Sequence, residues 1–303
     1  ADMAPDEFVN CLDFRYVDDA LTRDEALRIL ERNQATKDDR IRQLEENGYP
    51  AYTTSAGWLG YDDKKLRLLC NKAIEAGFSH IKLKVGESID DDIRRCKIAR
   101  ETIGDDIKLM IDANQAWEVD QAIKWIQTLE PFSPWFIEEP ISPDDVFGHK
   151  KIRENIGNIK VATGEHCQNR IMFKQFIAND AIDIVQIDAC RLGGLNEVLT
   201  VYMLAAKYGK PVCPHAGGVG LCEYVQHMSM IDFVQISAEI GERVIEYVDH
   251  LHEHFEDPCE IKNGAYRVPT LPGFSVKMYE SSLSSYEYPN GYEWRLRNNK
   301  MGT

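Results

Sequence analysis

The stretch His80–Val85 (HIKLKV) is a short β-rich run that carries two basic side chains, and it is one of a series of such runs. Side chains alternate along a strand, so Lys82 and Lys84 are expected to point to the same side. Before and after it, other β-rich runs occur at residues 51–55, 108–112, 135–138, 160–163, 183–188 and 212–215. Between them lie stretches with helical periodicity, most clearly Asp62–Ala76 and Val119–Leu129. This alternation predicts βαβ units and a parallel sheet.

The spacing of these units indicates whether the sheet is closed into a barrel or open. One strand plus one helix takes roughly 27 residues, so eight strands would need about 220 residues. The chain has 303 residues, which leaves room for one barrel and a tail. The rhythm favours a closed α/β barrel, although spacing alone also fits a doubly wound open sheet. We assign residues 1–257 to a β/α barrel and the proline-rich residues 258–303 to a C-terminal segment.

Local signals predict several helix boundaries. Thr22 and Glu25 have the spacing of a capping box, which opens a helix over Arg23–Arg32. Gly48 is expected to end a helix over Asp38–Asn47, since glycine is the usual residue just after a helix.

Composition and charge exclude several classes of function. Acidic residues outnumber basic ones by 50 to 35, and the resulting charge of −15 repels nucleic acid and anionic membranes. No run of 18 apolar residues is present, so no membrane-spanning helix is predicted. The eight cysteines form no C-x-x-C pair, which is typical of free thiols in a reducing compartment. We therefore expect a small-molecule partner and no nucleic acid or membrane.

Polar side chains able to do chemistry follow six successive runs, at the point where each strand would end. They are Lys84, Asp112, Glu138, Glu165, Asp188 and His215, spaced 23 to 28 residues apart. Because the C-terminal strand ends of a β/α barrel open into one shared mouth, we expect these six to converge on one ligand.

Three of the six are carboxylates, Asp112, Glu138 and Glu165, from consecutive units. Three anions held together repel one another unless a cation lies among them. Mg²⁺ prefers about six oxygen ligands and keeps positions for water or substrate, and the absence of Cys or His from the trio disfavours zinc. A single strand-end acid would more often be a helix cap or an ion-pair partner, but three in succession predict a magnesium site.

The other strand-end residues form two pairs. Lys82 and Lys84 would direct two ammonium groups into the mouth, which is costly unless anions meet them there. Their mutual repulsion favours loss of a proton from one of them, which then acts as a base. Asp188 and His215 close consecutive units, and a carboxylate beside an imidazole makes an acid–base pair.

The pattern is less decisive elsewhere. The eighth strand end is either Glu239, after an apolar run, or Glu246, and spacing does not choose between them. Residues His250, His252 and His254 have the pattern of a solvated helix face rather than of a zinc site.

At this point the sequence resembles a known family, the mandelate racemase group of the enolase superfamily. A Lys-x-Lys strand, metal carboxylates on the next three strands and an Asp–His pair on the sixth and seventh mark that group. Within it the chain is similar to the L-fuconate dehydratases, over almost its whole length. The segments that carry the likeness are residues 51–61, 110–115, 213–220 and 246–252.

The resemblance implies an enolase-type (β/α)7β barrel and a hydro-lyase that uses Mg²⁺. It implies that Lys84 removes the proton next to the substrate carboxylate, and that His215, oriented by Asp188, handles the leaving 3-hydroxyl. It favours Glu246 over Glu239 at the eighth strand. The other implied roles are metal binding by Asp112, Glu138 and Glu165, and substrate binding by Lys82, Asn114, Glu246 and Trp58.

The resemblance also implies a difference from the family. Its members begin with an α+β capping domain, whereas here the first strand comes near residue 51. We expect residues 258–303 to pack on that cap, which the sequence lacks.

The expected reaction is L-fuconate to 2-keto-3-deoxy-L-fuconate. The alternatives are dehydration or epimerisation of another sugar acid, and a cap-less, non-catalytic binding or regulatory form. The resemblance further suggests a mitochondrial location, with the cytoplasm otherwise, and allows a homo-oligomer.

Overall fold

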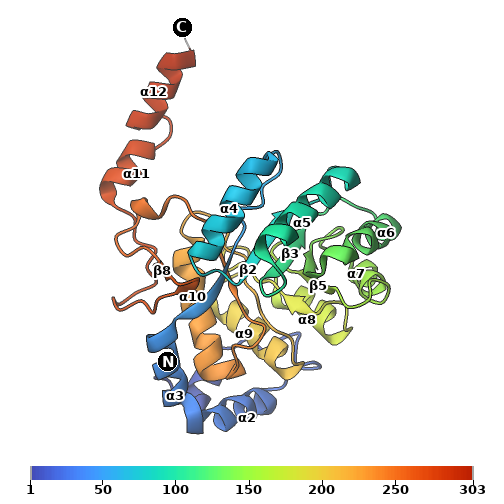
Figure 1. Ribbon diagram of the computed structural model, residues 1–303. Helices are drawn as coiled ribbons and strands as arrows, with labels where there is room; N and C mark the ends of the chain where they lie inside the picture. Colours follow the sequence, from blue (N-terminus) through green and yellow to red (C-terminus); the bar gives the residue numbers. More distant parts are fainter. Residues whose placement is uncertain (1, 302–303) are drawn as a thin grey trace.

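Seven parallel strands form the centre of the computed structural model, which describes residues 2–301 (Figure 1). Their hydrogen-bonded order from β1 to β6 follows the sequence, and β7 pairs with the other side of β1. The strands are β1 (Tyr49–Thr53), β2 (His80–Lys84), β3 (Lys108–Asp112), β4 (Pro134–Glu138), β5 (Lys160–Thr163), β6 (Ile184–Val185) and β7 (Ile245–Tyr247).

The sheet closes into a barrel, which decides between the two arrangements that spacing alone left open. Residues 212–215 fill the gap between β6 and β7, although they make only an isolated bridge, Val185 to Val212. His215 N–H donates to Ile187 on one side, and Glu246 N–H donates to the Pro214 carbonyl at 3.3 Å on the other. The segment therefore stands where an eighth strand belongs, and the predicted closed β/α barrel is confirmed.

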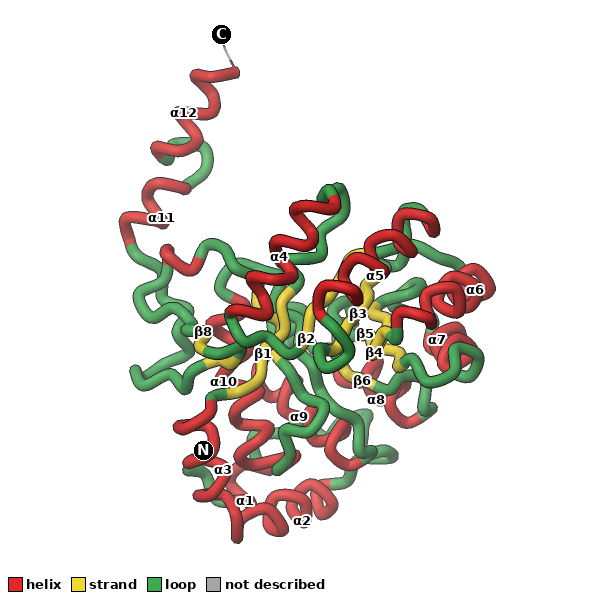
Figure 2. Tube along the Cα trace, in the orientation of Figure 1, coloured by secondary structure: helices red, strands yellow, loops and turns green. Residues whose placement is uncertain are grey.

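Helices cover the outside of the strands (Figures 1 and 2). They are α4 (Asp63–Glu75), α5 (Ile89–Ile103), α6 (Val119–Leu129), α7 (Val146–Arg153), α8 (Arg170–Ala178), α9 (Leu195–Lys207) and α10 (Leu221–Ile231). Short helical segments are η1 (Gln34–Thr36), η2 (Glu130–Phe132), the π-helical η3 (Asp232–Ser237) and η4 (His252–His254). No helix among residues 2–301 is long and apolar enough to cross a membrane.

The N-terminal residues form α1 (Pro5–Val9), α2 (Arg23–Asn33) and α3 (Lys37–Asn47). The predicted capping box at α2 is confirmed, because Thr22 Oγ1 accepts from Glu25 N–H while the Glu25 carboxylate accepts from Thr22 N–H. Gly48 ends α3 with φ +73°, a conformation that favours glycine. Asn33 and Arg40 donate to backbone carbonyls of η3, which ties these helices to the barrel.

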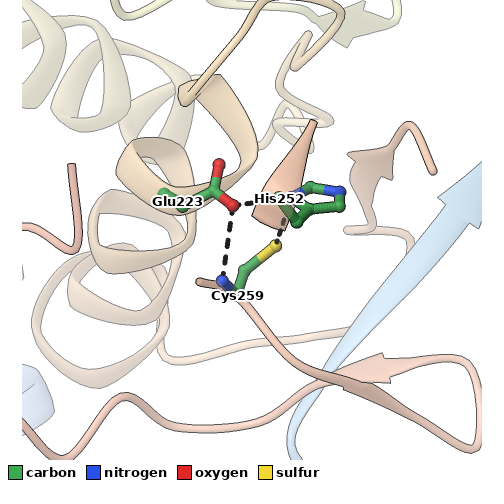
Figure 3. Close-up of side chains that lie close together, drawn as sticks. All are labelled: Glu223, His252 and Cys259. Carbon is green, nitrogen blue, oxygen red and sulfur yellow. Dashed lines mark hydrogen bonds and ion pairs between the residues drawn. The ribbon is translucent and has the colours of Figure 1, made fainter. Parts of the chain in front are cut away.

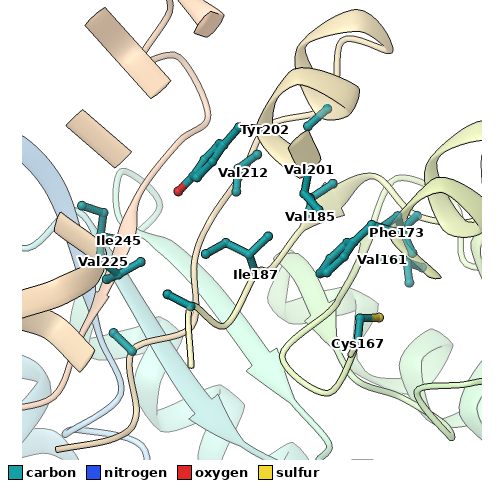
Figure 4. Packing of buried hydrophobic residues seen from close by; sticks show 14 of the residues in the cluster. Val161, Cys167, Phe173, Val185, Ile187, Val201, Tyr202, Val212, Val225 and Ile245 are labelled. Carbon is teal, nitrogen blue, oxygen red and sulfur yellow. The ribbon is translucent and has the colours of Figure 1, made fainter. Parts of the chain in front are cut away.

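Two cores hold the barrel together. The larger lies between strands and helices, and Figure 4 shows the part around Val185, Phe173 and Val201. The smaller fills the barrel interior and consists of Tyr52, Met110, Phe136, Ala162, Ile184, Cys213 and Val244. Side chains two positions further along several of these strands also point inward, one layer closer to the mouth. This layer begins the site.

The C-terminal segment starts as part of the barrel and then leaves it. Hairpin strands β8 (Ile261–Lys262) and β9 (Ala265–Tyr266) add to the start of β1 in antiparallel pairing. The helices α11 (Glu280–Tyr286) and α12 (Tyr292–Met301) then extend away from the barrel (Figure 2). The assignment of residues 258–303 to a cap-binding segment stays a prediction.

Candidate active site

Lys82 lies at the bottom of the mouth and is enclosed by carboxylates. Its Nζ donates to both oxygens of Glu138 at 2.7 Å, and it lies 3.4 Å from Asp112 and 3.2 Å from Glu246. Burial opposes the charged form, but the neighbouring carboxylates outweigh burial and hold the pKa of Lys82 well above its usual value. The prediction that one of the two lysines loses its proton therefore does not apply to Lys82 in this arrangement.

Lys84 occupies a more open position on the same strand. Its side chain is 15% exposed, against 1% for Lys82, and its Nζ lies 2.5 Å from Asp112 Oδ2. Nζ also lies 5.6 Å from the centre of the Trp58 ring, and Trp58 is itself 42% exposed. Of the two lysines, Lys84 is thus the one placed to meet a ligand.

His215 and Asp188 form the predicted pair. His215 Nδ1 lies 2.8 Å from Asp188 Oδ2, and the other Asp188 oxygen accepts from the N–H groups of Cys190 and Arg191. Burial lowers the pKa of His215, but the hydrogen bond to Asp188 and the charge of Glu246 outweigh it and raise the pKa to about 9. His215 is therefore an imidazolium at neutral pH, with Nε2 free of the Asp188 contact.

Glu246 is the eighth strand-end residue. Its carboxylate accepts from Ala216 N–H at 2.8 Å and lies 3.8 Å from His215 Nε2. The alternative, Glu239, follows η3 instead of a strand, and its side chain is 71% exposed beside Arg243. The geometry thus places Glu246, and not Glu239, among the other site residues.

The three candidate metal ligands share the mouth but are not gathered on one point. Burial, together with the charges of Asp112 and Glu165, raises the pKa of Glu138 well above its usual value. Glu165 follows Gly164, whose φ of +140° turns the chain at the end of β5. The Glu165 carboxylate lies near Glu139 and His166. The ligand atoms of Asp112, Glu138 and Glu165 do not all lie within 4.8 Å of one another.

This donor set fits Mg²⁺, because hard carboxylate oxygens are its preferred protein ligands. Glu165 is the most open of the three carboxylates, with 12% of its side chain exposed, whereas Asp112 and Glu138 are fully buried.

Asn114 joins the site through its backbone. Its N–H donates to Asp112 Oδ1 at 2.9 Å, and its φ of +44° starts the turn that follows β3. The residue is exposed at the rim of the mouth.

Several site residues escaped the sequence reasoning. Gln186 donates to Glu138 Oε2 at 2.7 Å, and His166 Nδ1 lies 2.6 Å from the buried Glu139. Gln186 lies two residues before Asp188, and His166 directly follows Glu165. Because side chains alternate along a strand, Gln186 could have been predicted to point inward like Asp188. The expectation of a solvated histidine face was wrong for His252, which is partly buried and lies 2.6 Å from the buried Glu223.

Comparisons with known proteins agree with this arrangement. Residues 65–282 match the family model of enolase C-terminal domain-like proteins. L-galactonate dehydratase of Hypocrea jecorina is 54% identical over 301 residues, which cover 97% of this chain and 66% of that protein. Mitochondrial enolase superfamily member 1 of Homo sapiens is 49% identical over 296 residues, covering 97% and 67%. The chain thus spans about two thirds of the length of these curated relatives.

Solved structures show the same likeness. The crystal structure of the human protein has a TM-score of 0.96 and covers 98% of this chain and 68% of its own. L-talarate dehydratase from Polaromonas sp. JS666, complexed with Mg and L-glucarate, is 29% identical, with a TM-score of 0.68 over 86% of this chain and 70% of its own.

Proposed function

This chain belongs to the enolase superfamily, and we propose from this premise that it is the catalytic barrel of a magnesium-dependent sugar-acid dehydratase. One observation carries the proposal. The imidazolium of His215, fixed by Asp188, shares one mouth with Lys84, the more open of the two lysines, and with three carboxylates. Such a mouth holds a base, an acid and a cation site around one small anion.

The residues divide the reaction between them. In its amine form Lys84 accepts the proton from C2 of the acid, and the electron pair of that bond forms the C2–C3 double bond. The C3–O bond breaks as His215 Nε2 gives its proton to the hydroxyl, which leaves as water. The resulting enol rearranges to the 2-keto-3-deoxy acid.

The remaining residues bind and orient. Asp112, Glu138 and Glu165 would hold Mg²⁺, which when bound stabilises the negative charge that develops on the substrate carboxylate. Lys82 would lie below this carboxylate with the buried Glu246 beside it, and Asn114 and Trp58 would line the substrate at the rim.

For the substrate we propose L-fuconate. It is the 6-deoxy form of L-galactonate, the acid named for the relative from Hypocrea jecorina, so the two share every stereocentre and differ only in the 6-hydroxyl. Dehydration or epimerisation of another sugar acid is the second candidate, because the same base and cation serve both. A non-catalytic binding form is the third.

The deciding experiment is turnover of a sugar-acid panel with and without Mg²⁺, measured as appearance of the 2-keto acid. We expect magnesium-dependent product from L-fuconate, with L-galactonate slower. Product from a different acid would keep the reaction and replace the substrate, and inversion at C2 without a keto product would identify an epimerase. Magnesium-dependent binding without turnover would identify the non-catalytic form.

The relatives' name carries the word mitochondrial, and we extend that location to this protein as part of the proposal. We propose a small sugar acid as its binding partner. We also propose that copies of the chain associate as a homo-oligomer. Fractionation of cells that produce the natural protein checks the location.

A further inference from the structure

A second group of metal-type donors lies outside the mouth, where three segments meet (Figure 3). Glu223 comes from α10, His252 from η4, and Cys259 from the loop before β8. His252 Nδ1 lies 2.6 Å from Glu223 Oε1 and 3.7 Å from Cys259 Sγ, and one ligand atom from each residue lies within 4.8 Å of the others. A carboxylate, an imidazole and a thiol thus face one another.

The ring of His252 is oriented as in a metal ligand. Its Nε2 lies 2.8 Å from the Val248 carbonyl, and its ring stacks on Tyr247 with centres 5.2 Å apart. Because Nε2–H donates to that carbonyl, Nδ1 is the nitrogen that gives up its proton to present a lone pair to a metal. Metal-binding histidines usually donate their second nitrogen in this way, which fixes the tautomer.

The spacing can be compared with a tetrahedral zinc site. Zn–S of about 2.3 Å and Zn–N of about 2.05 Å at a tetrahedral angle put the two donor atoms about 3.6 Å apart. The observed 3.7 Å between Cys259 Sγ and His252 Nδ1 matches this. The oxygen–nitrogen edge should be about 3.3 Å, so the 2.6 Å contact between Glu223 and His252 has to open by about 0.7 Å.

The thiol of Cys222, which precedes Glu223 on α10, is 1% exposed and neighbours the thiol of Cys259, but it lies outside the group of three donors. Glu223 itself is fully buried, and among residues 2–301 its Oε2 has no hydrogen-bond partner. A buried carboxylate with an unused oxygen is costly, and a bound cation would offset that cost.

We propose that Glu223, His252 and Cys259 bind a divalent transition metal of the zinc type, with the fourth position left to water or to the neighbouring thiol of Cys222. Thiolate and imidazole select such metals over magnesium, so the site is chemically distinct from the carboxylates of the mouth. It joins the segment after residue 257 to α10 and thereby fixes the hairpin beside β1. In the metal-free chain a proton on His252 takes the place of the cation, and the charged ring pairs with Glu223.

Cobalt(II) is the probe, because thiolate ligands give it a charge-transfer band and tetrahedral geometry gives it strong visible bands. The full chain, reduced and freed of metal, is titrated with cobalt in a large excess of Mg²⁺, which occupies the carboxylates of the mouth. We expect one equivalent to produce both bands, zinc to abolish them, and acid to weaken binding because protons compete for the ligands.

Variants assign the ligands. Cys259→Ser should lose the charge-transfer intensity of that thiolate, and His252→Gln should weaken cobalt binding. The control Cys190→Ser removes an exposed cysteine that lies outside this group and should bind like the unmodified chain. The proposal is overturned if the reduced, unmodified chain gives no thiolate band, an outcome that requires no variant to fold. It is also overturned if folded Cys259→Ser and Cys222→Ser, checked by circular dichroism, both keep the full band.

Discussion

Lys82 and Lys84 show how far two residues of one strand can differ. Both point into the barrel, but Lys82 is held by carboxylates on several sides, whereas Lys84 meets Asp112 at the edge of solvent. A base has to reach the substrate proton, and only the outer position allows that. The inner lysine instead balances the charge on which the site is built.

At the scale of this residue we predict that Lys84→Ala stops exchange of the substrate C2 proton with solvent deuterium. General-base catalysis is typically worth about 10²–10⁴-fold, so turnover should fall by that range. Proton NMR of the substrate in D₂O measures it. His215→Asn is the matched variant and should keep C2 exchange while losing the keto product. Exchange that survives in Lys84→Ala would move the base to another residue.

A second residue-scale prediction concerns His80. Burial, helped by the charge of Lys108, lowers the pKa of His80 to about 4, from 6.5 in the unfolded chain. As pH falls below 6.5 the unfolded chain takes up this proton first, so stability decreases down to about pH 4. The loss approaches about 3 kcal/mol at the lower end. Urea unfolding of His80→Gln should be less sensitive to acid by this amount, and His250→Gln, at an exposed position, should match the unmodified chain.

Residue types at strand ends could be predicted because the barrel imposes a regular interval on them. Lys84, Asp112, Asp188 and His215 were found in this way. Partners such as Gln186 and His166 were missed, because their role comes from contacts across the mouth that no interval encodes. His252 was misjudged for the same reason, since Glu223 approaches it from a helix in another part of the sequence.

At the scale of elements, Gly57 fixes the loop after β1 against β2. Its carbonyl accepts from Lys84 N–H at 2.9 Å, and a Cβ at this position would lie 2.1 Å from the Lys82 carbonyl oxygen. Gly57→Ala should therefore displace the strand and lower the free energy of unfolding by about 1–3 kcal/mol. Gly193→Ala, whose added Cβ would meet its nearest atom at 3.8 Å, is the control for chemical denaturation. Equal stability of the two variants would contradict this account.

Elements were easier to predict where strand and helix signals differed. The strands before residue 163 were predicted to within two residues, and α6 to its ends. The apolar run before Glu239 resembled a strand but forms η3, because a short run without alternation fits a buried helix equally well. Burial against α2 and α3, which are distant in sequence, decides the outcome.

At the scale of the whole molecule, the C-terminal segment divides into a part that the barrel needs and a part that it does not. Tyr266 in β9 is fully buried and its hydroxyl donates to the Glu246 carbonyl at 2.5 Å, whereas α11 has no buried residue. Ending the chain after residue 279 should leave the melting temperature unchanged. Ending it after residue 257 should lower it clearly, since β8 and β9 are lost. Differential scanning calorimetry compares the two, and equal melting temperatures would show that the hairpin contributes nothing.

The pairing of β1 with β7 has a consequence for how the chain is made. Ala51 and Ile245 lie side by side, although the remaining strands of the barrel lie between them in the sequence. During synthesis the backbone groups on the β7 side of β1 therefore stay unpaired until β7 has left the ribosome. An unpaired strand edge can pair with another nascent chain. Contacts between such distant positions form slowly. Pulse-labelled hydrogen exchange during refolding should show the amides of β3 and β4 protected before those of β7.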